Sequence, residues 1–192
     1  MDNLQALVDV LERGGVVACP TETWLGLLAD ASNERAVRRV AELKGRPADM
    51  PIALLLPSTD SIRVVALDLP PAAEALMEAH WPGPLTLLVP ARPELDPRLV
   101  KDGKVGVRVP GPSPAAELTR AFGRPLTATS ANLSGQPPVR SVDELPATLA
   151  DGIDALVPGV CPGGAPSTLV DASETPMRIL RAGAVDIGST AL

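Results

Sequence analysis

The chain has 192 residues and a formal net charge of −6, and 45% of its residues are hydrophobic while only 2% are aromatic. This length suffices for one ordinary core, so we expect a single domain over residues 1–192. No apolar run approaches the roughly 20 residues of a membrane span, and the first residues lack the basic start of a signal peptide, which predicts a cytoplasmic protein without a membrane partner.

The first segments predict a helix, a buried strand and a loop that carries hydroxyl groups. Apolar residues recur at helical spacing over residues 2–13, and residues 16–19 form an apolar run typical of a strand. Pro20 cannot donate to a sheet ladder, so the strand should end there and release Thr21-Glu-Thr23 as a loop.

A second helix is predicted over residues 32–44, with Ser32 as its N-cap and Gly45 as its stop. Its end delivers Lys44 and Arg46 together beside the hydroxyl loop, which indicates the start of an anion site. Taken alone, two cations at a helix end are better explained as partners of the negative end of the helix dipole than as a site, and the further polar segments downstream change that balance. We expect their removal to leave thermal stability nearly unchanged, because exposed cations contribute little to folding.

The remaining chain alternates between predicted strands and helices, which indicates an α/β layer structure. Ser141 and Glu144 suggest a capping box, although Pro146 limits the helix that follows to a short or broken one. Cys19 and Cys161 are predicted to be buried free thiols. The further strands are expected at residues 51–56, 85–89, 105–109, 126–129, 155–157 and 177–181, and the helices at 70–80 and 113–122.

The sequence contains neither of the glycine-rich phosphate motifs G-x-x-x-x-G-K-[ST] and G-x-G-x-x-G, and its one histidine, His80, has no obvious partner for nucleophilic catalysis. What remains is a set of hydroxyls, amides and cations near strand ends. Such a set suits a reaction driven by positioning and charge neutralisation, as in nucleotidyl transfer. Its members are Thr21, Thr23, Lys44, Arg46, Arg108, Ser130, Asn132, Ser134, Ser167, Thr168 and Arg181.

Six segments, taken in order, resemble the YrdC/Sua5 family over nearly the whole chain, at the length of its short bacterial form. The combination of a Lys-x-Arg pair, a Ser-x-Asn pair and a Pro-Thr-(Asp/Glu) loop is specific to that family. The segments are Pro20-Thr-Glu-Thr-Trp-Leu-Gly-Leu27, Leu43-Lys-Gly-Arg-Pro47, Trp81-Pro-Gly-Pro-Leu-Thr86, Val107-Arg-Val109, Thr129-Ser-Ala-Asn-Leu-Ser-Gly135 and Pro166-Ser-Thr-Leu-Val-Asp171.

The resemblance implies a mixed α/β fold of the YrdC/RibB-like type, an open twisted sheet flanked by helices around a deep basic concavity. It also implies an L-threonylcarbamoyladenylate synthase, which combines L-threonine, bicarbonate or CO2, and ATP into threonylcarbamoyl-AMP and pyrophosphate. Mg²⁺ would accompany the nucleotide, and no metal site on the protein is expected. The product would pass to a threonylcarbamoyl-transferase machinery that modifies adenosine 37 of tRNA, with at most a weak contact between this chain and tRNA.

Matching positions carry the family's functional residues onto this sequence. Thr23, Arg108, Ser130 and Ser167 would hold L-threonine, and Lys44, Arg46, Asn132, Arg140 and Arg181 would hold ATP. Lys44, Arg46, Ser130 and Asn132 would form the catalytic group.

The chain departs from the family pattern at Trp24-Leu25, Met50 and Leu55, where polar or other side chains are common in the family. These changes leave open a relative that adenylates a different carbamate. A module that binds tRNA or double-stranded RNA without turnover is the other alternative, and it predicts salt-sensitive tRNA binding weakened by Lys44→Ala and Arg46→Ala.

Overall fold

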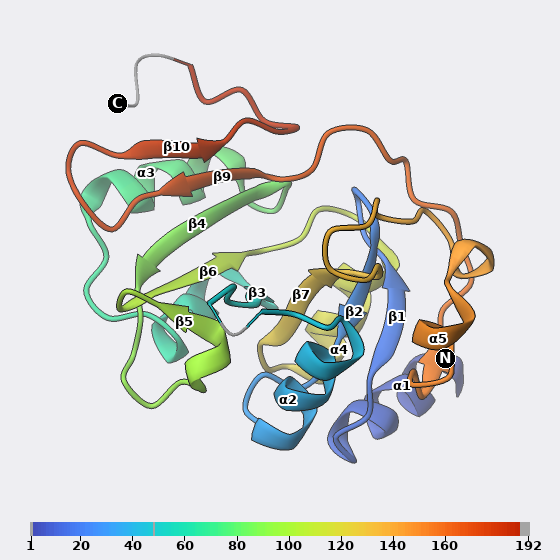
Figure 1. Ribbon diagram of the computed structural model, residues 1–192. Helices are drawn as coiled ribbons and strands as arrows, with labels where there is room; N and C mark the ends of the chain where they lie inside the picture. Colours follow the sequence, from blue (N-terminus) through green and yellow to red (C-terminus); the bar gives the residue numbers. More distant parts are fainter. Residues whose placement is uncertain (1, 48, 189–192) are drawn as a thin grey trace.

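The computed structural model describes residues 2–47 and 49–188 and is built around one mixed β-sheet (Figure 1). The strands are β1 (Val17–Pro20), β2 (Leu25–Leu28), β3 (Ala53–Leu55), β4 (Leu85–Pro90), β5 (Val100–Lys101), β6 (Lys104–Arg108), β7 (Leu126–Ser130), β8 (Ala155–Leu156), β9 (Thr168–Asp171) and β10 (Arg178–Arg181). Their order across the sheet is β10-β9-β4-β6-β3-β7-β2-β1-β8, with β5 paired to β6. The pairs β9/β4, β6/β3 and β1/β8 are parallel and the others antiparallel, which confirms the open mixed α/β sheet that the family resemblance implies.

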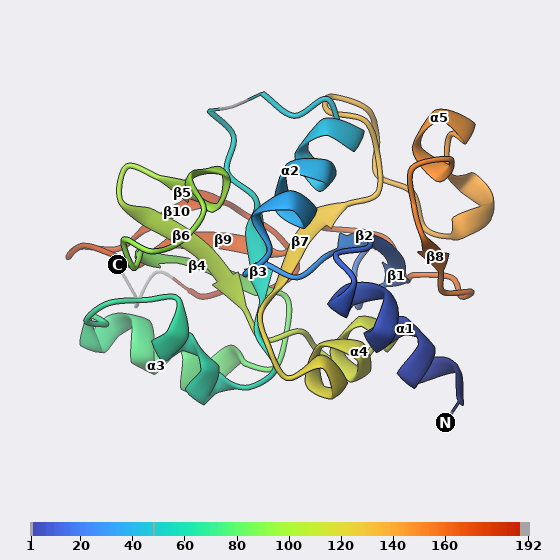
Figure 2. The same cartoon turned by 90° about the horizontal axis from the view of Figure 1, so that it is seen from below.

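Helices cover both faces of this sheet. They are α1 (Asp2–Glu12), α2 (Glu34–Leu43), α3 (Pro71–His80), α4 (Pro114–Phe122) and α5 (Ala147–Ala150), with 3-10 turns at Thr59–Val64, Pro97–Leu99 and Val142–Glu144. Figure 2 shows α2 on one side of the sheet and α1, α3 and α4 on the other. Among residues 2–47 and 49–188, no helix has the length and apolar character that crossing a membrane requires.

The N-terminal strand shows how the sequence places two cores. Val16 and Ala18 belong to the larger apolar cluster, which also contains the buried face of α2. Val17 and Cys19 belong to the smaller cluster, together with residues of α1 and α4. Because successive side chains of a strand point to opposite faces, a run without polar residues is what a strand covered on both sides requires.

Two helix caps differ from the sequence-based prediction. Asn33, not Ser32, caps α2, since Asn33 Oδ1 accepts from Arg35 N at 3.1 Å while the Ser32 hydroxyl donates to Asp30 at 2.6 Å. The predicted capping box at Ser141 does not form. Its side chain makes no cap hydrogen bond, and Glu144 Oε2 instead accepts from Arg140 N at 2.8 Å.

Both cysteines are buried free thiols, as predicted. Burial raises the pKa of Cys19 to about 12, so this thiol stays protonated and behaves as a small apolar core residue.

Candidate functional site

A cavity of about 1060 Å³ lies over one face of the central strands. Four neighbouring strands line it, and three of them do so with alternate residues, as expected when one face of a sheet borders open space. The alternating pairs are Ala53 and Leu55 on β3, Thr86 and Leu88 on β4, and Gly106 and Arg108 on β6, while β7 contributes its last three residues, 128–130.

Small residues at the sheet surface leave room for this cavity. Ala53, Gly106 and Ala128 lie on the neighbouring strands β3, β6 and β7 and project little or no side chain. A Cβ atom at Gly106 would lie 3.3 Å from both Ala53 Cβ and Leu88 Cδ2. The open volume therefore depends on residue size at the centre of the sheet as well as on the surrounding loops.

The cavity is basic although the chain as a whole is acidic. Among the described lining residues, the basic ones outnumber the acidic ones, and Asp171 is already bound to Lys104 Nζ at 2.9 Å. This excess of positive charge confirms the predicted basic concavity. The basic residues are Arg46, Lys101, Lys104, Arg108, Arg178 and Arg181, and the acidic ones are Asp49, Asp102 and Asp171.

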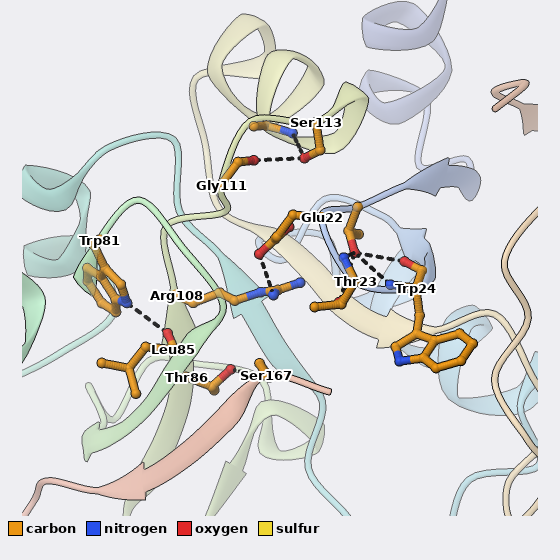
Figure 3. A network of polar contacts seen from close by, with 12 residues as sticks. Glu22, Thr23, Trp24, Trp81, Leu85, Thr86, Arg108, Gly111, Ser113 and Ser167 are labelled. Carbon is orange, nitrogen blue, oxygen red and sulfur yellow. Dashed lines mark hydrogen bonds and ion pairs between the residues drawn. The ribbon is translucent and has the colours of Figure 1, made fainter. Parts of the chain in front are cut away.

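Arg108 presents a guanidinium to this cavity from β6 and is held from behind by Glu22. Its Nη1 donates to Glu22 Oε1 at 2.6 Å, and the two side chains are only 9% and 12% exposed. Burial lowers the pKa of Arg108, the Glu22 carboxylate raises it, and nearby Arg181 lowers it again, with a net lowering. Glu22 Oε2 is buried without a hydrogen-bond partner among the described residues, so one carboxylate oxygen carries the pairing. Figure 3 shows the guanidinium pointing toward Thr23.

The end of α2 brings Arg46 to the cavity through a glycine turn. Gly45 has a φ of +54°, and the Arg46 N–H returns to Ala41 O at 3.0 Å, so the helix closes with a left-handed residue that favours glycine. The Arg46 guanidinium donates to Pro51 O at 2.6 Å and Met50 O at 2.7 Å. Arg46 therefore also fixes the segment that leads into β3.

Lys44 turns inward instead of lining the cavity. It is 2% exposed, and its Nζ donates to Ser130 O, to Asn132 O at 2.7 Å and to Asn132 Oδ1 at 3.3 Å. Its own carbonyl accepts from Ser134 N at 2.9 Å. Burial, together with nearby Arg46, lowers the pKa of Lys44 to about 8. The expectation that Lys44 is an exposed cation is wrong, because the ammonium joins α2 to the turn after β7.

The turn after β7 is held from within as well. Ser130 Oγ donates to Asn132 Oδ1, and Asn132 Nδ2 donates to Gln136 O at 2.6 Å. Both Ser130 and Asn132 line the cavity. Together with the hydrogen bonds from Lys44, these contacts hold the Ser130 hydroxyl and the Asn132 amide in fixed positions at the cavity.

The loop between β1 and β2 is closed by Thr21. Its Oγ1 accepts from Thr23 N at 3.1 Å and Trp24 N at 3.2 Å and donates to Trp24 O at 2.7 Å. Leu25 N then donates to Val139 O at 3.0 Å. The hydroxyl of Thr21 thus organises the loop, and Thr23 and Trp24 line the cavity next to it (Figure 3).

The Ser167 hydroxyl, just before β9, also lines the cavity. Ser167 Oγ lies 2.9 Å from Thr86 Oγ1, and Arg181 donates to Ser167 O at 2.8 Å and to Ser167 Oγ at 3.1 Å. Thr168 and Ser134, both members of the predicted set, do not line the cavity. Thr168 Oγ1 donates to Val185 O at 2.6 Å, and Ser134 Oγ is buried without a hydrogen-bond partner among the described residues.

The structure brings most of the predicted site residues to one cavity. Lys44 and Arg140 do not line it. Arg140 Nε donates to Cys161 O at 3.0 Å, and its side chain packs on Gly163. The lining residues from the predicted set are Thr21, Thr23, Arg46, Arg108, Ser130, Asn132, Ser167 and Arg181.

Sequence reasoning assigned no role to Glu22 or Thr86. An arginine in an apolar strand signals that a buried acid is needed, but the spacing of 86 residues between Glu22 and Arg108 hides which acid it is.

No group of three or more His, Cys, Asp or Glu side chains within residues 2–47 and 49–188 is placed to hold a metal ion.

Comparison with known proteins places this geometry in context. A family model named Sua5_yciO_yrdC, with the description "Telomere recombination", matches residues 9–183. A threonylcarbamoyl-AMP synthase from Pyrococcus abyssi is 38% identical over 180 residues, covering 92% of this chain and 53% of that protein. One from Vibrio parahaemolyticus is 34% identical over 187 residues, covering 95% of this chain and 100% of that protein. The chain thus spans about half the length of the first relative and the full length of the second.

A solved structure shares the fold. The crystal structure of P. abyssi Sua5 complexed with L-threonine has a TM-score of 0.85 and 35% sequence identity, covering 94% of this chain and 54% of that chain.

Proposed function

The chain belongs to the Sua5/YciO/YrdC family, and from this premise we propose that it is an L-threonylcarbamoyladenylate synthase. The observation that carries the proposal is the convergence of three guanidinium groups on one cavity. Arg46, Arg108 and Arg181 come from the end of α2, from β6 and from β10, and all three line it beside neutral hydroxyls and an amide.

The chemistry explains why cations and not a protein nucleophile should be gathered there. The amine of L-threonine adds to CO2 and releases a proton, which gives a carbamate anion. A carbamate oxygen then attacks the α-phosphorus of ATP, and the bond from that phosphorus to the bridging oxygen breaks, so that pyrophosphate leaves with the electron pair. Both reactants are anions, so the protein must neutralise and align them, which fixed cations achieve at the moment of charge development.

We propose that Arg108 holds the carboxylate of L-threonine, with Thr23, Ser130 and Ser167 supplying hydroxyl contacts. Glu22 orients the guanidinium from behind, and a planar arginine suits two parallel contacts to a carboxylate. The half-exposed Met50 also lines the cavity and offers the substrate apolar contact, whereas the side chain of Leu55 is 0% exposed and packs in the smaller apolar cluster.

For ATP we propose Arg46, Asn132 and Arg181 at the phosphates and Arg140 at the periphery. Lys44 acts through the turn after β7, because its ammonium donates to Ser130 O and to both oxygens of Asn132. The described carboxylates form no metal cage, so we propose that Mg²⁺ enters bound to the phosphates of ATP.

Beyond the site, we propose that residues 1–192 form one domain and that the protein works in the cytoplasm. One sheet joins strands from both ends of the chain, which supports a single unit. The mixed anhydride product calls for a threonylcarbamoyl-transferase that accepts it and modifies tRNA.

Incubation with ATP, labelled bicarbonate and L-threonine tests the proposal, with labelled threonylcarbamoyl-AMP and pyrophosphate as the expected products. Arg46→Gln should lower kcat/KM at least 100-fold, since it removes a cation from the phosphates. Arg38→Gln is the matched control, because Arg38 lies on α2, the helix that precedes Arg46, is 48% exposed and pairs with Glu42. Its activity should equal that of the wild type.

Two outcomes would contradict the assignment. Labelled adenylate with an amino acid other than threonine would indicate a synthase for a different carbamate. No adenylate with any amino acid, together with salt-sensitive tRNA binding, would indicate an RNA-binding module instead.

A further inference from the structure

The chain has only three aromatic residues, and two of them are committed to the core. Trp81 is 8% exposed, and its indole N–H donates to Leu85 O at 2.7 Å. Phe122 is 6% exposed and lies under the guanidinium of Arg124, 4.3 Å from the ring centroid. Neither ring is available to a ligand.

Trp24 differs from both of them because it is half-buried and lines the cavity. Its backbone N–H and C=O are both bound to the hydroxyl of Thr21, and the next residue is tied to Val139 O. Because the loop is already ordered in the folded protein, a tryptophan on it offers a large apolar surface that loses little further conformational entropy when a ligand binds. It is the aromatic ring among the described lining residues.

The placement of Trp24 fits one part of the proposed substrates better than the others. L-Threonine, the carbamate and the triphosphate are charged or small, and they suit the cations and hydroxyls around Arg108, Ser130 and Ser167. The nucleobase is flat and uncharged, so it needs a ring surface instead. In Figure 3 the Trp24 indole extends away from the Arg108–Glu22 pair, beyond Thr23.

We propose that Trp24 is the base-binding residue of this site and stacks its indole on the adenine ring of ATP. This inference rests on the proposed function for the identity of the nucleotide. An indole can stack on any nucleobase, but it gains nothing from a ligand that has no base. Trp24 would therefore favour binding of a nucleoside triphosphate over a bare polyphosphate. The arginines that bind the triphosphate cannot by themselves distinguish a nucleoside triphosphate from a bare polyphosphate.

Intrinsic fluorescence tests the contact without turnover. ATP should quench or shift the emission of the wild-type protein, whereas inorganic tripolyphosphate, which carries the phosphates but no base, should leave it unchanged. Trp24→Leu retains only the buried Trp81, so its emission should not respond to ATP, and it corrects for light absorbed by the nucleotide. Equal responses to ATP and tripolyphosphate, or a full ATP response in Trp24→Leu, would overturn the proposal.

Kinetics give the second readout. Trp24→Ala should raise the KM of ATP roughly 5- to 100-fold and leave the KM of L-threonine within about twofold, while Trp24→Phe should keep the KM of ATP within about threefold of wild type. A melting temperature near that of the wild type confirms that each variant is folded. A rise in the KM of L-threonine with an unchanged KM of ATP would place Trp24 at the amino acid and refute base stacking.

The two hypotheses fail in different ways. If wild-type protein forms no adenylate but ATP still changes the emission where tripolyphosphate does not, the proposed reaction is wrong and the base contact stands. If adenylate forms with a Trp24→Ala enzyme of unchanged KM values, the reaction stands and the base contact is wrong.

Discussion

Replacement of Lys44 by methionine tests whether the buried ammonium holds the turn after β7. Methionine keeps most of the side-chain volume and removes the N–H donors from Ser130 O, Asn132 O and Asn132 Oδ1. Asn132 Oδ1 still accepts from Ser130 Oγ and Ser130 O still accepts from Asn132 N, so of the three acceptors Asn132 O is the one left without another donor among the described residues. Leaving it unpaired costs about 1–3 kcal/mol, and losing each of the other two charged hydrogen bonds costs about 1.5–3 kcal/mol, which together gives roughly 4–9 kcal/mol. The pKa of Lys44, lowered to about 8 from 10.5, marks an opposing desolvation cost of roughly 3 kcal/mol that the variant no longer carries.

The first effect is the larger one, so we expect Lys44→Met to lower the free energy of unfolding by roughly 3 kcal/mol at pH 7. For a chain of this size, that corresponds to a fall in melting temperature of about 6–12 °C. Lys101→Met is the control, because Lys101 is 51% exposed and lies 3.9 Å from its partner Asp49. It should change the free energy of unfolding by less than about 0.5 kcal/mol.

The pH dependence of the same pair of proteins gives a sharper test. Since the folded-state pKa of Lys44 is about 8 and lies below the ordinary 10.5, the unfolded chain binds the proton more tightly. The penalty is present below pH 8 and is relieved as pH rises toward 10.5, so the wild type should gain stability relative to Lys44→Met in that window. Urea unfolding at several pH values measures this difference. A stability gap that is small at pH 7 and constant up to pH 10 would refute the reasoning.

Three further results are expected. Glu22→Gln should lower the free energy of unfolding by about 3 kcal/mol, measured by urea, because it leaves buried Arg108 without its countercharge; an unchanged midpoint would show that the pair does not hold the site. Gly106→Leu should abolish adenylate formation while Gly106→Ala retains some, because a Cβ there already lies 3.3 Å from Ala53 Cβ and Leu88 Cδ2, a tight contact that only a small side chain tolerates; full activity with leucine would place the substrates elsewhere. Asp154→Asn should cost about 1 kcal/mol at pH 7, because Asp154 binds Arg39 at 2.6 Å and is half-exposed. Burial raises the pKa of Asp154, but its hydrogen bonds outweigh this and lower it, so the difference between Asp154→Asn and wild type should vanish as pH falls below about 4 in acid unfolding curves.

The succession of helices and strands was predictable because local signals mark most of the element ends. Ser113 followed by Pro114 gives the start of α4 at the expected place, with Ser113 Oγ accepting from Ala116 N at 3.2 Å. The short β2 strand was not predicted, since Leu25-Gly-Leu-Leu28 carries no alternation and follows a loop directly. Its place in the sheet comes from pairing with β1 and β7.

The site residues were predictable as a set, but not their individual tasks. Arg46 and Lys44 lie two residues apart, yet one lines the cavity and the other is 2% exposed. The partners of Lys44 include backbone carbonyls 86 and 88 residues away, which no pattern in the sequence identifies. The same holds for Glu22, whose pairing with Arg108 depends on where the loop between β1 and β2 meets the end of β6 in the folded protein.

The cavity walls come from nearly the whole length of the chain, from Thr23 in the loop before β2 to Arg181 in β10. During synthesis, the last guanidinium emerges from the ribosome long after the first hydroxyl, so the binding surface is completed only when the last strand joins the sheet. A ligand that touches both ends can bind only the finished assembly. Saturation with such a ligand therefore reports on folding of the whole sheet and should delay its unfolding as one cooperative event.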